Sequence, residues 1–328
     1  MKLLIALSHP FELWNPPDWV AQKLRANFPE LEVVHLKEYS RVHEEILDTE
    51  VAIAWSLRPE QIKSAKYLRW VHCPAAAVHA LIFPEMVESD IMLTNASSVH
   101  GPVVAEHVIA LIFALAKKIP QAVRLQERHE WGQQTMWESV PRPREIREVV
   151  LGLIGVGSIG SAVAKLADAL GMQVIAVREH PEAPKPDGVG HVFAPEQLDS
   201  FLAQSDFVVL AAPVTPRTRQ LIDAPRLRQM KPEAYLINVG RGALIDHAAL
   251  LEALRNRQIG GAALDVFEKE PLASDSPLWN LENLLITPHS AGLTEKLWQR
   301  HYDLISRNLC RYLEGRPLLG VVDKQRGY

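Results

Sequence analysis

The sequence has little cysteine, little net charge and no long hydrophobic segment. Its two cysteines, Cys73 and Cys310, are too few for a disulfide framework, lack the spacing of a metal site and are typical of a reducing compartment. The formal net charge of −4 provides no general attraction to nucleic acid or anionic lipid. The apolar run from Val108 to Ala116 falls far short of the about 20 residues that span a bilayer. We therefore expect a soluble, cytoplasmic protein without nucleic-acid or membrane partners.

Several catalytic motifs are absent as well. The segments 43–47 and 129–133 begin with His-Glu but lack the second histidine of H-E-x-x-H, and no G-x-S-x-G elbow occurs. Metal-dependent hydrolysis and serine-hydrolase chemistry fit poorly, and we predict no metal site. The apolar start, Leu3–Leu7, is too short for a signal peptide and lacks a small-residue cleavage site, which favours a first β-strand.

The amino-acid composition is that of an ordinary globular protein, and strand-like segments alternate with helical segments along the chain. Apolar residues make up 48% and charged residues 23% of 328 residues, and this length corresponds to two domains of roughly 150 residues each. Short apolar runs predict a first series of strands at Leu3–Leu7, Val51–Trp55, Leu68–Cys73 and Ile91–Thr94, with a helix at Asp18–Phe28. A second series is predicted at Val149–Ile154, Val174–Val177, Phe207–Ala212, Tyr235–Val239, Ala262–Val266 and Leu284–Thr287. Strands alternating with helices indicate βαβ units and therefore two α/β domains with parallel sheets.

Between the two series lie an apolar helix and an irregular connection. The segment Val103–Lys118 is apolar on nearly every side and ends in two lysines, which predicts a buried helix at a domain or subunit junction. This helix would be buried either against the rest of the same chain or against a second subunit. Residues 129–148 show almost no periodicity, so we expect a surface connection in which Trp131 and Trp137 serve packing.

A glycine motif follows the first strand of the second series. Gly155-Val-Gly157-Ser158-Ile159-Gly160 comes directly after Val149–Ile154 and precedes a predicted helix, Ser161–Leu170, with Gly171 at its C-terminus. In this context Gly155 permits the tight turn, Gly157 lets a pyrophosphate approach the backbone, and Gly160 permits close helix–strand packing. The free N–H groups of the helix N-terminus would bind the phosphates. The alternative is a glycine-rich turn without a ligand.

Arg178 bears on which dinucleotide would bind. It follows the strand Val174–Val177, where an NAD site usually has Asp or Glu and where an arginine can accommodate a 2′-phosphate. The sequence therefore favours NADP over NAD at this position. The adjacent Glu179 opposes this reading, and the alternative is that Arg178 is a solvated surface charge.

Three later segments place polar side chains at the ends of predicted strands, where an open parallel sheet presents its ligands. Arg241 lies between glycines, Asp265 and Glu270 follow the segment 260–264, and His289 follows the last predicted strand. A guanidinium, a carboxylate and an imidazole suit a 2-keto acid: Arg241 would bind its carboxylate or polarise its carbonyl, His289 would exchange the proton, and Glu270 would orient the imidazole and stabilise its protonated form. Each residue alone could equally be structural.

At these residues the sequence resembles the D-2-hydroxyacid dehydrogenase family, which includes phosphoglycerate, formate and glyoxylate/hydroxypyruvate reductase members. The resemblance covers essentially the whole chain and is most specific over Gly155–Gly160, Asn238–Gly242, Ala263–Pro271 and Thr287–Gly292. It implies that Arg241, Glu270 and His289 form the catalytic triad. It also implies that Asp265 lies near the nicotinamide and that Pro213 brings backbone against the cofactor.

The resemblance further implies two doubly wound parallel-sheet domains, Rossmann-like or flavodoxin-like, with the cofactor domain inserted into the substrate domain. The substrate domain would comprise residues 1–100 and 291–328, and the NAD(P)-binding domain residues 101–290. The helix Val103–Lys118 matches the element through which family members form homodimers. The chain departs from the family at Arg178, which replaces the usual Asp of NAD-dependent members. It also departs at the loop 74–79. In the family the matching loop binds the substrate carboxylate and commonly contains glycine, whereas this chain has Ala76 and Ala77 there.

The sequence thus predicts an oxidoreductase that transfers a hydride between NADPH, or NADH, and a small 2-keto acid or D-2-hydroxyacid. The residues do not indicate which acid this is. The alternative, which also exists as a branch of the family, is a non-catalytic, nucleotide-sensing corepressor or scaffold on the same fold.

Overall fold

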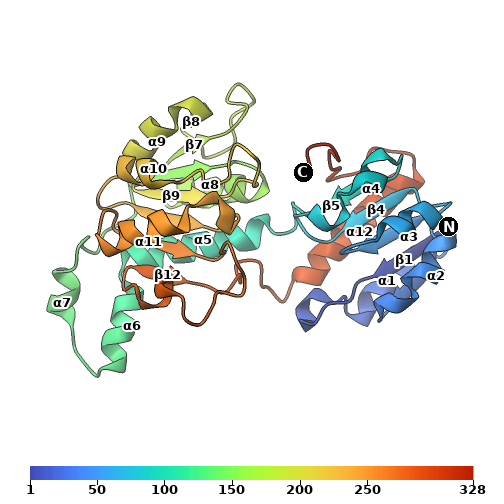
Figure 1. The fold of residues 1–328 in the computed structure, drawn as a ribbon, viewed down its shortest axis with the longest axis horizontal. Coiled ribbons are helices and arrows are strands. Elements are labelled where there is room, and N and C mark those ends of the chain that lie inside the picture. The colour runs from blue at the N-terminus through green and yellow to red at the C-terminus, as the bar shows by residue number, and fades with distance from the viewer. Residues whose placement is uncertain (328) are drawn as a thin grey trace. The chain divides into compact units, whose positions relative to one another are not determined.

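The computed structural model describes residues 1–327, which divide into two compact units (Figure 1). Unit 1 comprises Met1–His100 together with the chain from Thr294 onward, and unit 2 comprises Gly101–Leu293. Unit 2 is therefore inserted into the sequence of unit 1. Each unit has its own parallel sheet and its own hydrophobic core.

Unit 1 contains a five-stranded parallel sheet in the order β2-β1-β3-β4-β5. Its strands are β1 (Lys2–Ala6), β2 (Glu32–Leu36), β3 (Val51–Ala54), β4 (Trp70–Cys73) and β5 (Met92–Asn95). This is the strand order of flavodoxin-like domains, in which the ligand edge lies at the carboxyl ends of the strands.

Helices cover both faces of the unit 1 sheet, because successive strand residues point to opposite sides. The helices are α1 (Asp18–Asn27), α2 (Val42–Glu45), α3 (Pro59–Ser64), α4 (Pro84–Glu88) and α12 (Leu297–Leu313). Leu3 and Ile5 of β1 belong to one core, with α1 and α12. Leu4 and Ala6 belong to the other, which includes Ile46 and Met86. The C-terminal helix α12 therefore completes a core that the first hundred residues leave open.

Unit 2 contains a seven-stranded parallel sheet in the order β12-β11-β10-β9-β6-β7-β8. Its strands are β6 (Val150–Ile154), β7 (Gln173–Val177), β8 (His191–Phe193), β9 (Phe207–Leu210), β10 (Tyr235–Asn238), β11 (Gly261–Leu264) and β12 (Leu284–Ile286). The order reverses direction between β6 and β9, which is the topological switch point at which Rossmann folds bind dinucleotides. The expected α/β class with two doubly wound parallel sheets is confirmed.

Two groups of helices enclose the unit 2 sheet. The helices of this unit are α5 (Gly101–Ala116), α6 (Ile119–Glu127), α7 (Gln133–Trp137), α8 (Ser158–Ala169), α9 (Leu198–Gln204), α10 (Ala224–Gln229) and α11 (His247–Arg255). Leu151 and Leu153 of β6 pack with residues of α5 and α8, whereas Val208 and Leu210 of β9 pack with residues of α9, α10 and α11.

The structure contains several elements for which no range was predicted, among them β2, β8 and α7. Strand β2 carries a glutamate and a histidine, and β8 has only three residues, so neither gives a clear apolar run; both lie at sheet edges. Helix α7 lies in the stretch expected to be irregular. Figure 1 shows α6 and α7 extending away from the sheet of unit 2. In this arm, defined as residues 119–140, Trp131 is 94% exposed, so the expected packing role is not met within the chain for this residue. Trp137 is 54% exposed, and the Arg142 guanidinium lies 4.6 Å from the centre of its ring.

Helix α5 is covered on one face by its own unit. Residues such as Val104, Val108 and Ile112 are buried in the core that α5 shares with α8. This face of the helix is therefore buried against the same chain, which was one of the two alternatives. Ala110 and Phe113 remain exposed on the other face. Within residues 1–327, no helix is both long and apolar enough to cross a membrane.

Candidate active site

The predicted site residues of unit 2 gather at one edge of its sheet, because every strand is parallel and the residues follow strand ends. Gly155 follows β6, Arg178 follows β7, Arg241 lies three residues after β10, and Asp265 directly follows β11. His289 lies three residues after β12. Pro213 lies in the exposed turn after β9, where its carbonyl accepts a hydrogen bond from the Thr218 hydroxyl at 2.7 Å.

The glycine loop has the geometry that a phosphate site needs. Gly155 has a φ of 93°, in the region that favours glycine, and a Cβ on Gly160 would lie 2.1 Å from the Gly155 carbonyl oxygen. A Cβ on Gly157 would meet nothing within 4 Å, so space is open directly before helix α8. The helix begins at Ser158, three residues earlier than predicted, and its first amides, on Ser158 and Ile159, have no acceptor within the helix. These residues fit the pyrophosphate of a dinucleotide.

Two glycine substitutions separate packing from phosphate binding. We expect Gly160→Ala to lower the free energy of unfolding by about 1–3 kcal/mol or more, because the new methyl group meets a backbone oxygen that cannot move away cheaply. Gly157→Ala is the matched control: we expect unfolding to change by less than about 0.5 kcal/mol, whereas dinucleotide affinity falls roughly tenfold because the methyl group occupies the open space. Urea unfolding and fluorescence titration measure the two effects. Equal dinucleotide affinity in Gly157→Ala and the unchanged protein would contradict phosphate binding here.

The end of β7 carries a cluster of charges that includes one residue the sequence did not single out. Arg178 donates hydrogen bonds to the carbonyls of Pro184, at 3.1 Å, and Ala183. Glu179 does not pair with Arg178; it pairs with Arg217, at 3.3 Å, from the loop after β9. Arg178 and Arg217 thus both lie at this corner of the sheet. Arg217 went unnoticed because 38 residues separate it from Glu179.

His289 and Glu270 form a close pair. The Nδ1 atom of His289 lies 2.6 Å from Oε2 of Glu270, and Oε1 of Glu270 accepts a hydrogen bond from the Phe267 amide at 2.9 Å. The imidazole side chain is 55% exposed, so Nε2 can reach a ligand. His289 has a φ of 52°, an uncommon backbone conformation that its amide stabilises by donating to the Asp265 carbonyl at 2.8 Å.

Asp265 binds the loop that carries His289. Its side chain is buried, and it accepts hydrogen bonds from the Thr287 hydroxyl at 2.5 Å, from the Ser290 amide at 2.8 Å and from the Ala291 amide at 3.0 Å. His107 of α5 lies 3.8 Å from the same carboxylate. Burial lowers the pKa of His107, and the charge of Asp265 opposes that shift. Asp265 thus holds the loop around His289, through two backbone amides after it and the Thr287 hydroxyl before it, donors that the sequence alone did not identify.

Arg241 lies opposite the Glu270 segment. The side-chain nitrogen Nδ2 of Asn238 donates to the Arg241 carbonyl at 2.9 Å, which fixes the turn after β10. A Cβ on Gly242 would lie 1.9 Å from the carbonyl carbon of Phe267, so only glycine allows the two loops to touch. Partial burial lowers the pKa of the Arg241 guanidinium, and the negative charge of Glu270 opposes that shift. The guanidinium remains protonated in any ordinary buffer.

The predicted carboxylate loop lies in unit 1, after β4. Ala76 is exposed, Ala77 is partly exposed, and the Ala76 carbonyl accepts a hydrogen bond from the Asn95 side chain at 3.0 Å. Within residues 1–327, neither the Ala76 amide nor the Ala77 amide donates a hydrogen bond to the protein. Both amides are therefore available to an anion.

Comparison with known proteins bears on this arrangement. The family model for "D-isomer specific 2-hydroxyacid dehydrogenase, NAD binding domain" matches residues 109–291. A glycerate dehydrogenase of Methylorubrum extorquens is 33% identical over 264 residues, which are 80% of this chain and 81% of that protein. A glyoxylate reductase of Thermofilum pendens is 33% identical over 270 residues, 81% of this chain and 78% of that protein. The chain spans only 44% and 57% of the length of two D-3-phosphoglycerate dehydrogenases that it also matches.

A solved structure shares the whole fold. The D-isomer specific 2-hydroxyacid dehydrogenase of Xanthobacter autotrophicus Py2, in complex with NADPH and MES, is 31% identical with a TM-score of 0.83 and covers 100% of this chain and 99% of its own. This match extends beyond the cofactor-binding unit to unit 1. The chain belongs to the D-isomer specific 2-hydroxyacid dehydrogenase family.

Proposed function

We propose that this protein reduces a small 2-keto acid to the D-2-hydroxyacid with NADPH or NADH. The observation that carries the proposal is the 2.6 Å contact between His289 and Glu270, at the same sheet edge as Arg241 and the glycine loop. An imidazole, a carboxylate and a guanidinium beside a dinucleotide site meet the needs of carbonyl reduction. A bound nicotinamide dinucleotide supplies the hydride; this chain supplies the proton, the substrate contacts and the orientation.

In this proposal His289 delivers the proton. Its Nδ1–H donates to Glu270, which orients the ring and stabilises the imidazolium form, and Nε2–H gives its proton to the carbonyl oxygen as charge develops there. Asp265 serves as a positioning residue, because its buried carboxylate accepts hydrogen bonds from the two backbone amides that follow His289 and from the Thr287 hydroxyl before it. In the reverse direction the neutral imidazole accepts the proton of the hydroxyl group.

Arg241 would bind the substrate carboxylate or polarise its carbonyl. A guanidinium matches a carboxylate with two parallel hydrogen bonds, and its permanent charge favours the oxygen on which negative charge develops. The amides of Ala76 and Ala77 are our candidates for a further contact with the carboxylate, since neither has an acceptor in the described chain.

For the cofactor, we propose that the glycine loop 155–160 holds the pyrophosphate at the N-terminus of α8, as its open space before that helix suggests. Pro213 would bring the backbone after β9 against the dinucleotide. Arg178 and Arg217 would favour the 2′-phosphate of NADPH over the free hydroxyl of NADH.

A panel of keto acids tests the activity. Purified protein is mixed with NADPH or NADH and with glyoxylate, hydroxypyruvate, pyruvate or a bulkier 2-keto acid, and the absorbance of the reduced nicotinamide is followed. We expect turnover on at least one of them. Tight cofactor binding without turnover on any would instead favour a nucleotide-sensing binding protein.

We also propose a homodimer that uses the exposed face of α5. Ala110 and Phe113 lie on that face, and burying such apolar surface is favourable. Light scattering at micromolar concentration should give a mass about twice 36.7 kDa. A mass near 36.7 kDa would refute the dimer.

A further inference from the structure

Two histidines lie in the core of unit 1, and no step of the proposed reaction uses them. His72 is the third residue of β4, His301 belongs to α12, and both side chains are fully buried. Trp70 of β4 packs on α12, with its ring centre 5.6 Å from that of Tyr312. Because residues two apart on a strand point to the same face, His72 faces α12 as well.

The rings of these two histidines are incompletely paired. In the part of the chain that the structure describes, neither ring nitrogen of His301 has a hydrogen-bond partner, and Nε2 of His72 has none. Nδ1 of His72 lies 2.8 Å from the Thr94 hydroxyl, which also accepts the Trp70 indole N–H at 2.8 Å. A protonated imidazole carries two N–H donors. An added proton would therefore place a charge and an unpaired donor in this core.

The surroundings of the two rings oppose that charge. The ring of His301 lies 5.1 Å from that of Trp298 and 5.8 Å from that of His100. Burial lowers the pKa of His301 well below 6.5, and charge on His100 or His72 would lower it further. Burial alone lowers the pKa of His72 to about 4. No carboxylate of residues 1–327 forms an ion pair with His72 or His301, so both rings are neutral at pH 7.

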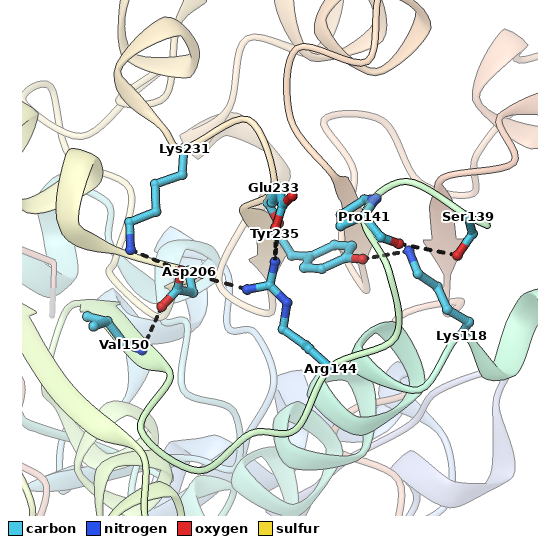
Figure 2. Close-up of polar contacts among 9 residues, drawn as sticks. All are labelled: Lys118, Ser139, Pro141, Arg144, Val150, Asp206, Lys231, Glu233 and Tyr235. Atoms are coloured by element: carbon cyan, nitrogen blue, oxygen red, sulfur yellow. Dashed lines mark hydrogen bonds and ion pairs between the residues drawn. The ribbon is translucent and has the colours of Figure 1, made fainter. Parts of the chain in front are cut away.

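Polar groups of unit 2 are accommodated differently. Asp206 accepts the Val150 amide at 2.9 Å and contacts Lys231 at 2.9 Å. Arg144 lies 3.7 Å from Asp206 and 3.2 Å from Glu233 (Figure 2). Each charge of this network faces one of opposite sign, and none belongs to a histidine, the side chain that ordinarily changes charge between pH 8 and 5. Mild acid therefore acts on the core of unit 1 rather than on this network.

Helix α12 is the element that the core of unit 1 can lose. It reaches the sheet only after the chain has passed through the whole of unit 2, residues 101–293. Its polar contacts with the first hundred residues include the Trp298 indole N–H, which donates to the Leu13 carbonyl at 2.8 Å, and the Tyr312 hydroxyl, 2.8 Å from Glu50. Detachment of α12 requires no unfolding of unit 2, and it restores conformational freedom to the helix segment.

We propose that His72 and His301 form an acid-sensitive switch, in which uptake of a proton by either ring detaches α12 from the sheet and opens unit 1 while unit 2 stays folded. A charged ring cannot remain between α12 and the sheet without a partner, and it reaches water when the two separate. In the opened unit both histidines take up protons below their ordinary pKa of 6.5. The closed unit does not, so its stability falls as the pH falls through 6.5. The switch is independent of the proposed reductase activity.

The tryptophans of the chain report this opening. Trp70 and Trp298 are buried in unit 1, whereas Trp131, Trp137 and Trp279 of unit 2 are exposed. A shift of the emission maximum to longer wavelength therefore reports the opening of unit 1. Urea titration of the purified full chain, followed by this shift, gives an equilibrium constant for opening at pH 7 and at pH 5.

A histidine with the ordinary pKa of 6.5 in the open unit, and neutral in the closed one, raises the opening constant about 25-fold between pH 7 and pH 5. With two such residues, we expect a rise of roughly two to three orders of magnitude in the unchanged protein. His301→Leu should make this rise about 25-fold smaller. His43→Ala, at an exposed histidine of the same unit, should leave it unchanged.

Hydrogen exchange with peptide mass spectrometry locates the opening. At pH 5, after correction for the intrinsic pH dependence of exchange, peptides of α12 should lose protection before those of β10 and β11. This measurement uses the unchanged protein and decides the matter even if His301→Leu does not fold. An opening constant that rises less than tenfold, an equally steep rise in His301→Leu, or simultaneous loss of protection in both units would overturn the proposal.

Discussion

Replacing His289 by alanine is expected to lower kcat for keto-acid reduction by about 10²–10⁴-fold, the usual contribution of a positioned general acid. The reason is local: in the proposed mechanism Nε2 protonates the carbonyl oxygen, and Glu270 fixes the ring from the other side at 2.6 Å. Dinucleotide affinity should remain within about twofold, because the glycine loop is untouched. Steady-state kinetics and fluorescence titration give the two values.

Two further variants make the result specific. Glu270→Gln keeps a hydrogen-bond partner for the imidazole but removes its charge, so we expect a smaller loss of kcat and a change in its pH dependence. His43→Ala removes an exposed histidine of unit 1 and should leave kcat unchanged. Near-full turnover in His289→Ala on the best keto acid would disprove the role of this residue.

The second large effect concerns the cofactor. We expect kcat/KM to be higher with NADPH than with NADH, by about one to two decades at most, since a charge-assisted hydrogen bond to the 2′-phosphate contributes about 1.5–3 kcal/mol. Arg178 already donates to two backbone carbonyls, which positions its guanidinium but reduces the donors left for a phosphate. Arg178→Asp should shift the preference to NADH, because a carboxylate repels the phosphate and accepts hydrogen bonds from the ribose.

Arg217 provides a separate test of the same corner. Its ion pair with Glu179 screens a carboxylate that would otherwise repel the 2′-phosphate. Arg217→Ala should therefore lower the NADPH-to-NADH ratio by a few-fold, while Arg219→Ala, at a nearby exposed arginine, should not. A higher kcat/KM with NADH in the unchanged protein would mean that Arg178 is only a surface charge.

Much of the fold was predictable because each central strand is a short apolar run with a turn behind it. The strands before the glycine loop, Arg241 and Asp265 were found in this way, and their parallel arrangement brings those residues to one edge. Edge strands β2 and β8 were not found, because one of them carries polar residues and the other is only three residues long. Helix α7 and the exposure of Trp131 were missed because the arm has almost no periodicity.

The site was only partly predictable, for a similar reason. Residue types and their places after strands identified His289 and Glu270, but their contact depends on the positive φ of His289 and on the Phe267 amide. Contacts between distant loops leave no local pattern. The pairing of Glu179 with Arg217 is of this kind and required the folded chain.

The most direct test of the central claim is the chirality of the product. The protein is incubated with a reduced nicotinamide dinucleotide and the best keto acid of the panel, and the 2-hydroxyacid formed is resolved by chiral chromatography. The arrangement of Arg241, Glu270 and His289 beside the glycine loop, in a chain of this family, predicts the D-enantiomer in an amount equal to the dinucleotide oxidised. Formation of the L-enantiomer, or oxidation of the dinucleotide without a hydroxyacid, would contradict it.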